Sequence, residues 1–151
     1  MIFRHIAHGM QCGVVQFIKG EQLSGEELFA RENLPQSDFY QMGTGFTCDT
    51  QDRSADMAAA KKTWAIAKPM LEDDSYHLVV LDELTYMLAY DYLAEDEVIE
   101  AIKNRPANQS VVVTGRGGGS RLKDAVDTVS EVKDIKHAYA QGITARKGVD
   151  Y

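Results

Sequence analysis

Two adjacent carboxylates, Asp82 and Glu83, come directly after the apolar run Leu-Val-Val-Leu at residues 78–81. A run without polar alternation is typical of a strand buried on both faces of a parallel sheet. Open α/β sheets bind their ligands at the carboxyl ends of such strands, and carboxylate oxygens suit Mg²⁺, an ion that bridges phosphate oxygens. The pair therefore favours a magnesium–phosphate site. The alternative is that Asp82 caps the next helix and that Glu83 is a solvated surface acid.

A glycine-rich segment, Gly-Arg-Gly-Gly-Gly at residues 115–119, follows a second apolar run at residues 110–114. Glycines allow backbone N–H groups to approach an anion closely, and a helix that begins after them favours negative charge. Arg116 and Arg121 would add bidentate contacts to a phosphate. The spacing does not match a dinucleotide-binding fingerprint, because Ser120 stands in the place of the third glycine. The alternative is a flexible turn without a ligand.

A different stretch, residues 20–27, has the glycine spacing of a phosphate-binding loop. Its last two positions are Glu26 and Glu27, where that motif requires Lys followed by Ser or Thr. Two carboxylates at these positions would repel a triphosphate, so we reject this segment as a nucleotide loop.

Residues 42–50, Met-Gly-Thr-Gly-Phe-Thr-Cys-Asp-Thr, have the composition of a mobile loop that closes over a ligand. Phe46 is either part of that closure or an anchor packed on the core. Cys48 is a candidate reactive thiol, although no histidine lies near it in the sequence to support one. Periodicity does not decide between these alternatives.

The segments with possible chemistry are connected by stretches that have the periods of strands and helices. Apolar runs typical of buried strands alternate with amphipathic stretches, which is the pattern of a mostly parallel sheet flanked by helices. The predicted strands are residues 12–18, 39–42, 77–81, 110–114 and 128–132, and the predicted helices are residues 3–8, 54–71, 95–103 and 122–126. The length of 151 residues suits a single α/β domain, residues 1–151.

Composition argues against several classes of function. The net charge of −7 is opposite to that of a typical nucleic-acid-binding protein. The sequence has no apolar run long enough to cross a bilayer, so we expect no membrane span. Its two cysteines lack a metal-type spacing, and so few are typical of a cytoplasmic protein with reduced thiols.

Several segments, in family order along nearly the whole chain, resemble the P-loop corrinoid adenosyltransferases. These segments are residues 13–20, 45–47, 79–86, 114–117, 125–131, 136–138 and 148–151. The resemblance implies a P-loop NTPase (RecA-like) fold and the transfer of the 5′-deoxyadenosyl group of ATP to a reduced corrinoid, with release of tripolyphosphate. In such a reaction Co(I) attacks the ribose C5′, while the protein positions the reactants and stabilises charge on the leaving group.

On the nucleotide side, the resemblance implies that Glu83 serves the Mg²⁺–triphosphate as metal ligand and catalytic residue, with Asp82 supporting it. Arg116 and Gly117 are the candidates for contact with ATP. The family's glycine-rich loop with its lysine would lie N-terminal to Phe3, and the sequence contains no such loop. We therefore expect that the chain lacks this segment and its strand, and that it binds ATP weakly or not at all. We also expect its open sheet edge to pair with another chain, as in a homodimer.

On the corrinoid side, the resemblance places Phe46, with Thr47 and Cys48, in the loop that packs beneath the corrin ring and displaces its lower axial ligand. Loss of that ligand makes Co(II) easier to reduce, and a flavoprotein reductant is an implied partner. The family usually has a tryptophan two residues after the loop phenylalanine, where this chain has Cys48. Because a thiol supplies less bulk, two alternatives stay open: a non-catalytic corrinoid- or partner-binding relative, and a structural subunit that completes its sheet with a partner.

Overall fold

The computed structural model of the chain describes residues 1–18, 25–42 and 53–149. Its centre is a sheet of four parallel strands in the order β2-β1-β3-β4. The strands are β1 (Gln11–Gln16), β2 (Ser37–Gln41), β3 (Tyr76–Asp82) and β4 (Ser110–Val113). The predicted α/β class with a parallel sheet is confirmed, and β2 and β4 form the edges of the sheet.

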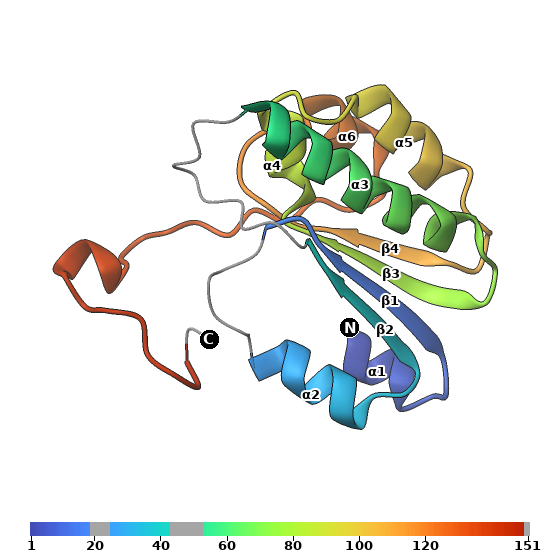
Figure 1. Cartoon of the computed structure of the whole chain (residues 1–151), viewed down its shortest axis with the longest axis horizontal. Helices are drawn as coiled ribbons and strands as arrows, with labels where there is room; N and C mark the ends of the chain where they lie inside the picture. Colours follow the sequence, from blue (N-terminus) through green and yellow to red (C-terminus); the bar gives the residue numbers. More distant parts are fainter. Residues whose placement is uncertain (19–24, 43–52, 150–151) are drawn as a thin grey trace.

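Helices cover both faces of this sheet (Figure 1). The helices are α1 (Ile2–Ile6), α2 (Gly25–Asn33), α3 (Arg53–Glu72), α4 (Leu84–Ala89), α5 (Glu95–Lys103), α6 (Ser120–Ala125) and the 3₁₀ turn η1 (Tyr139–Gln141). The helices α3 to α6 lie on one side of the sheet, with α1 and α2 on the other, and the segment after α6 leads away from the sheet (Figure 1). Among these helices, none is both long enough and apolar enough to cross a membrane.

The main core lies between the sheet and α3. Successive residues of a strand point to opposite faces, and Val15, Val79 and Leu81 all point toward this layer and are fully buried. They pack in one cluster with Trp64 and Leu71 of α3. Burial of each side chain of this size stabilises the fold by roughly 1.5–3 kcal/mol, so this layer fixes how α3 lies on the sheet.

The helix α3 has the spacing that the sequence predicts. Its buried residues Ala60, Trp64, Ala67 and Leu71 recur every three or four positions, which places them on one face of a helix. The indole Nε1–H of Trp64 donates a hydrogen bond of 2.9 Å to Glu97 Oε1 and so joins α3 to α5. The predicted helix at residues 54–71 is confirmed, and α3 extends one residue further at each end.

The segment after α6 corrects one prediction. Residues 128–132 form no strand, and Val132 is 96% exposed. The β-branched residues of this segment favour a strand only where a neighbouring strand offers backbone partners and a packed surface. After α6 this segment leads away from the sheet and pairs with none of the four strands (Figure 1), so its side chains have no packed surface beside them.

Two helices, α2 and α4, were not predicted from the sequence. The helix α4 is six residues long, too short for a helical period to be visible in the sequence. It lies where the sequence shows a cluster of aromatic residues, and Tyr86, Tyr90 and Tyr92 stack with ring centroids 6.3 Å and 5.6 Å apart. The helix α4 therefore directly follows the acid pair and connects it to an aromatic surface.

Candidate functional site

The candidate site lies at the carboxyl edge of the sheet, where the strand register aligns four polar side chains. Gln16, at the end of β1, is in register with Gln41 of β2 and with Asp82 of β3. The last registered pair between β3 and β4 comes one residue earlier, which brings Thr114 beside Asp82. Of this row, sequence reasoning selected only Asp82. A signal for the others was present, since each is a polar residue within two positions of the end of its predicted strand.

Both carboxylate oxygens of Asp82 accept hydrogen bonds from this row. The hydroxyl of Thr114 donates to Asp82 Oδ1 at 2.7 Å, and Gln16 Nε2 donates to Asp82 Oδ2 at 3.1 Å. Gln41 Nε2 in turn donates to Gln16 Oε1 at 3.1 Å. The alternative in which Asp82 caps the next helix is wrong, because Glu83 occupies the N-cap position of α4 and no side-chain hydrogen bond caps that helix.

Glu83 turns the chain from β3 into α4 in a left-handed backbone conformation, with φ of 59°. For a residue other than glycine this conformation costs roughly 1–3 kcal/mol and persists only where the surroundings enforce it. The backbone N–H of Glu83 donates to Thr114 Oγ1 at 3.0 Å, which holds the turn against β4. The side-chain atom Oε2 is buried without a hydrogen-bond partner among the described residues. A buried, unpartnered carboxylate oxygen is a candidate cation ligand.

The electrostatics of Glu83 disfavour its charged form. Burial raises the pKa of Glu83 above its ordinary value of 4.5, and the neighbouring charge of Asp82 raises it further, whereas Arg116 lowers it. Two carboxylates at adjacent positions repel each other when both are ionised. A divalent cation bound at Glu83 would offset this repulsion and the cost of burial.

The glycine-rich loop packs closely against the first turns of α4. A Cβ on Gly115, whose φ is 142°, would lie 2.2 Å from Thr85 Oγ1. A Cβ on Gly118, whose φ is 60°, would lie 2.4 Å from the carbonyl oxygen of Thr85 and 2.7 Å from the backbone nitrogen of Ala89. A Cβ on Gly117 would meet nothing within 4 Å. The loop therefore packs against α4 so closely that Gly115 and Gly118 have no room for a side chain. Gly117 has open space around it.

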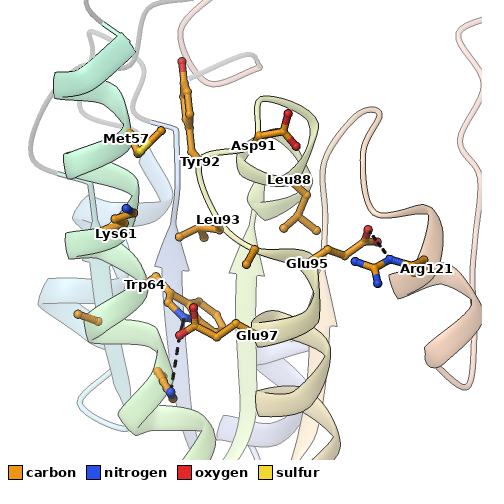
Figure 2. A pocket seen from close by; sticks show the side chains of 13 residues that line it. Met57, Lys61, Trp64, Leu88, Asp91, Tyr92, Leu93, Glu95, Glu97 and Arg121 are labelled. Atoms are coloured by element: carbon orange, nitrogen blue, oxygen red, sulfur yellow. Dashed lines mark hydrogen bonds and ion pairs between the residues drawn. The ribbon is translucent and has the colours of Figure 1, made fainter.

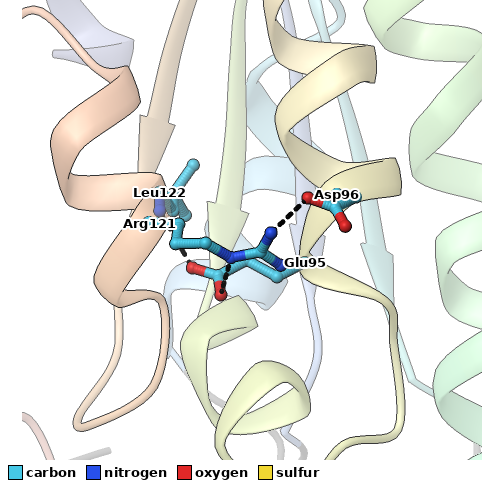
Figure 3. Close-up of polar contacts among 4 residues, drawn as sticks. All are labelled: Glu95, Asp96, Arg121 and Leu122. Atoms are coloured by element: carbon cyan, nitrogen blue, oxygen red, sulfur yellow. Dashed lines mark hydrogen bonds and ion pairs between the residues drawn. The ribbon is translucent and has the colours of Figure 1, made fainter.

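The two arginines of this segment have different surroundings. Arg121 Nη1 contacts Asp96 Oδ1 at 2.6 Å, and Arg121 Nε lies 3.4 Å from Glu95 Oε2 (Figure 3). The other carboxylate oxygen of Glu95 accepts the backbone N–H of Leu122 at 2.9 Å (Figure 3). The first turn of α6 and Arg121 are thus engaged by carboxylates of α5. Arg116 is exposed, and its positive charge lowers the pKa of Glu83.

The three predicted corrinoid contacts, Phe46, Thr47 and Cys48, lie outside the described residues. The described chain is well anchored on either side of them. Met42 directly follows the carboxyl end of β2 and is buried. Arg53 donates from Nη2 to the carbonyl oxygen of Tyr90 at 3.0 Å.

A pocket of about 750 Å³ opens on the helical side of the molecule, between α3 and the segment from α4 to α6 (Figure 2). Trp64, Leu93 and Glu97 are among the side chains that line it (Figure 2). Glu97 binds the Trp64 indole and lies 3.6 Å from Lys68 Nζ. Arg121 lines this pocket, whereas Asp82, Glu83 and residues 115–119 do not, so the pocket is separate from the acid pair and the glycine loop.

The donor set at the carboxyl edge fits Mg²⁺ bound together with a phosphate. Across residues 1–18, 25–42 and 53–149, no group of three or more His, Cys, Asp and Glu is arranged to hold a metal ion. Mg²⁺ does not need such a cluster, because it keeps several waters and binds through one or two carboxylates plus substrate phosphates. Glu83 would supply an unpartnered carboxylate oxygen, Asp82 would supply a second negative charge, and Arg116 would supply a cation for phosphate oxygens.

Comparison with known proteins covers the whole chain. Residues 1–151 match the family model described as ATP:corrinoid adenosyltransferase BtuR/CobO/CobP. The chain is 47% identical over 148 residues to the corrinoid adenosyltransferase of Escherichia coli (strain K12), a match that covers 98% of this chain and 74% of the relative. It is 48% identical over 151 residues to the corrinoid adenosyltransferase of Pseudomonas aeruginosa, covering 100% of this chain and 74% of the relative. The family resemblance inferred from the sequence is confirmed.

A matched pair of glycine substitutions tests the packing of the loop. Gly118→Ala should lower the free energy of unfolding by the cost of a left-handed residue, roughly 1–2 kcal/mol, and by a further roughly 1–3 kcal/mol for overpacking against α4. Gly117→Ala, with a similar φ of 68° and open space around it, should carry only the first cost. Urea denaturation followed by circular dichroism measures both. Equal losses in the two variants would contradict the packed loop.

The raised pKa of Glu83 predicts a pH-dependent gain in stability for Glu83→Gln. An acid with a raised pKa binds its proton more tightly in the folded state, so it destabilises the fold as pH rises from 4.5 through its folded pKa. The variant should therefore melt at a higher temperature than the wild type at neutral pH, without divalent cations, and the difference should vanish below pH 4.5. Melting curves of both proteins over this pH range, in buffer with EDTA, measure the difference. A difference in melting temperature that does not change with pH would refute the raised pKa of Glu83.

Proposed function

This chain belongs to the ATP:corrinoid adenosyltransferase family, and we propose that it transfers the 5′-deoxyadenosyl group of ATP to the Co(I) centre of a reduced corrinoid. The cobalt donates its electron pair to the ribose C5′, the C5′–O bond breaks, and tripolyphosphate leaves with the bonding electrons. The observation that carries the proposal is the family match over residues 1–151, in a chain whose acid pair ends a parallel strand.

In this proposal, the acid pair and the glycine loop bind Mg·ATP. Glu83 is the proposed catalytic residue and Mg²⁺ ligand, supported by its buried and unpartnered Oε2. When bound with ATP, Mg²⁺ would neutralise charge on the leaving tripolyphosphate. Arg116 is exposed, its charge lowers the pKa of Glu83, and its guanidinium suits a bidentate contact with phosphate oxygens. Gly117, where a Cβ would meet nothing within 4 Å, is the proposed backbone contact with ATP, and Asp82 supports Glu83.

In this proposal, the corrinoid is contacted by Phe46, Thr47 and Cys48. Family resemblance supports the role of Phe46 as the side chain that packs beneath the corrin ring and favours loss of the lower axial ligand. Loss of that ligand raises the Co(II)/Co(I) potential, so that a cellular reductant can form the nucleophile. Cys48, in place of the usual tryptophan, predicts a weaker displacement of the ligand in this chain.

The protein is further proposed to work as a cytoplasmic homodimer that receives electrons from a flavoprotein. Large apolar side chains outside the core support a partner surface. Phe3 is 69% exposed and Phe29 is 48% exposed, and their rings meet edge to face at 6.3 Å on the side of α1 and α2. The net charge of −7 is consistent with partners other than nucleic acid.

Isothermal titration with Mg·ATP, in the presence and absence of cob(II)alamin, tests the proposed function. The wild-type chain should bind Mg·ATP, and Glu83→Gln should weaken that binding at least about tenfold. The matched control is Glu131→Gln, which removes an exposed acid of the C-terminal segment. Formation of adenosylcobalamin, followed by its absorption spectrum, would complete the test. Corrinoid binding without any ATP binding would instead establish a non-catalytic corrinoid-binding relative.

The substitution Cys48→Trp separates ligand displacement from adenosyl transfer. With cob(II)alamin and an external reductant, the variant should form adenosylcobalamin several-fold faster, because the larger ring favours loss of the lower ligand. With cobalamin already reduced chemically to Co(I), which has no lower ligand, the two proteins should react at equal rates. An equal gain in both assays would show that position 48 acts elsewhere in the reaction.

A further inference from the structure

A continuous row of side-chain hydrogen bonds crosses all four strands beside Glu83. It runs from Gln41 to Gln16, from Gln16 to Asp82, and from Thr114 to Asp82, with donor–acceptor distances of 3.1 Å, 3.1 Å and 2.7 Å. Along the row, each hydrogen bond is donated in the direction of Asp82. None of its members belongs to the glycine-rich loop at residues 115–119. The row therefore has a direction, and the carboxylate of Asp82 is its end point.

Thr114 connects this row to the backbone of Glu83. Its hydroxyl has a single proton, which it donates to Asp82 Oδ1, so its oxygen is free to accept the backbone N–H of Glu83 at 3.0 Å. The same side chain thus fixes the carboxylate of one acid and the left-handed turn of the next. A change at Thr114 acts on both acids at once.

The two acids differ in how their carboxylates are held. Glu83 Oε2 is buried with no hydrogen-bond partner among the described residues. Each oxygen of Asp82 accepts one hydrogen bond, which fixes the orientation of the carboxylate and leaves a second lone pair on each oxygen for an ion. Ligating carboxylates in metal sites are commonly held by such outer hydrogen bonds.

We propose that Gln16, Gln41 and Thr114 are positioning residues, which hold the carboxylate of Asp82 and, through Thr114, the turn at Glu83 in the orientation that the Mg²⁺ of Mg·ATP requires. This inference rests on the proposed function for the identity of the ion and its phosphate ligand, but the hydrogen-bonded row is a property of the chain without nucleotide.

The opposite end of β1 supplies a matched control. Gln11 donates to Asp38 Oδ2 at 2.8 Å, and Tyr76 donates to the same atom at 2.7 Å. This exposed cluster also ties a glutamine of β1 to a carboxylate, but it lies at the amino edge of the sheet. Gln11→Leu therefore removes the same side chain from the same strand without touching the candidate site.

The decisive measurement is the gain in ATP affinity that Mg²⁺ confers, obtained by titrating ATP into each full-length variant with Mg²⁺ and with EDTA. Gln16→Leu and Thr114→Val should lose about 10- to 100-fold of that gain, with unchanged ATP affinity in EDTA. Thr114→Ser, which keeps the hydroxyl, and Gln11→Leu should behave as the wild type. A general folding defect would instead weaken binding in both conditions.

The outcomes of this titration separate the inference from the function on which it rests. If Glu83→Gln loses the Mg²⁺ gain while Gln16→Leu and Thr114→Val keep it, the positioning role is overturned and the proposed function stands. If the wild-type chain shows no Mg²⁺-dependent ATP binding, the proposed function falls, and with it the assignment of the ion to Glu83.

A second measurement tests the row without nucleotide or metal. In ¹⁵N-labelled protein, the side-chain amide resonances of Gln16 and Gln41 should be shifted from free glutamine and protected from exchange. Thr114→Val should move the Gln16 resonance through their shared acceptor, and Gln41→Leu should move it directly. Resonances at free-glutamine positions that respond to neither substitution would overturn the row itself.

Discussion

The parallel register of the four strands is the constraint on which the candidate site depends. It places Gln16 between Gln41 and Asp82 and brings Thr114 to the other side of that acid. Side chains of a strand alternate between faces, so a slip of one residue between two strands would move an entire set of side chains to the opposite face. The buried valines and leucines on the helical side make such a slip costly, because it would expose them. The core therefore sets the geometry of the polar edge.

Local strain and close packing lie at the same edge. Glu83 adopts a left-handed conformation, and the next residue but one, Thr85, meets the backbone of Gly115 and Gly118 with no room for a Cβ. The helix α4 is anchored below by Leu84 and Met87, both fully buried. The acid turn and the glycine loop thus hold each other in place, and the resulting buried carboxylate has an electrostatic cost that a cation would relieve.

Much of the architecture was accessible from the sequence because its signals are local. Apolar runs located the strands, and a three-to-four residue period located α3 within one residue at each end. The acid pair was placed correctly at the carboxyl end of β3. Family order along the chain identified the class of enzyme, which the comparison with known proteins confirmed. These features depend on short stretches of residues and on their spacing.

The residue types at the carboxyl edge can be read from the sequence, but the partners of each side chain depend on the folded arrangement of the strands and helices. Residues 128–132 have strand-forming side chains but lead away from the sheet (Figure 1), so they pair with none of its strands and are exposed. Arg121, which by its position resembles a phosphate contact, is engaged by the carboxylates of α5. Asp82, for which a helix cap was the alternative interpretation, accepts hydrogen bonds from Gln16 of β1 and from Thr114, directly after β4. Each of these outcomes depends on groups more than twenty residues away in the sequence, and only folding brings such groups within hydrogen-bonding distance.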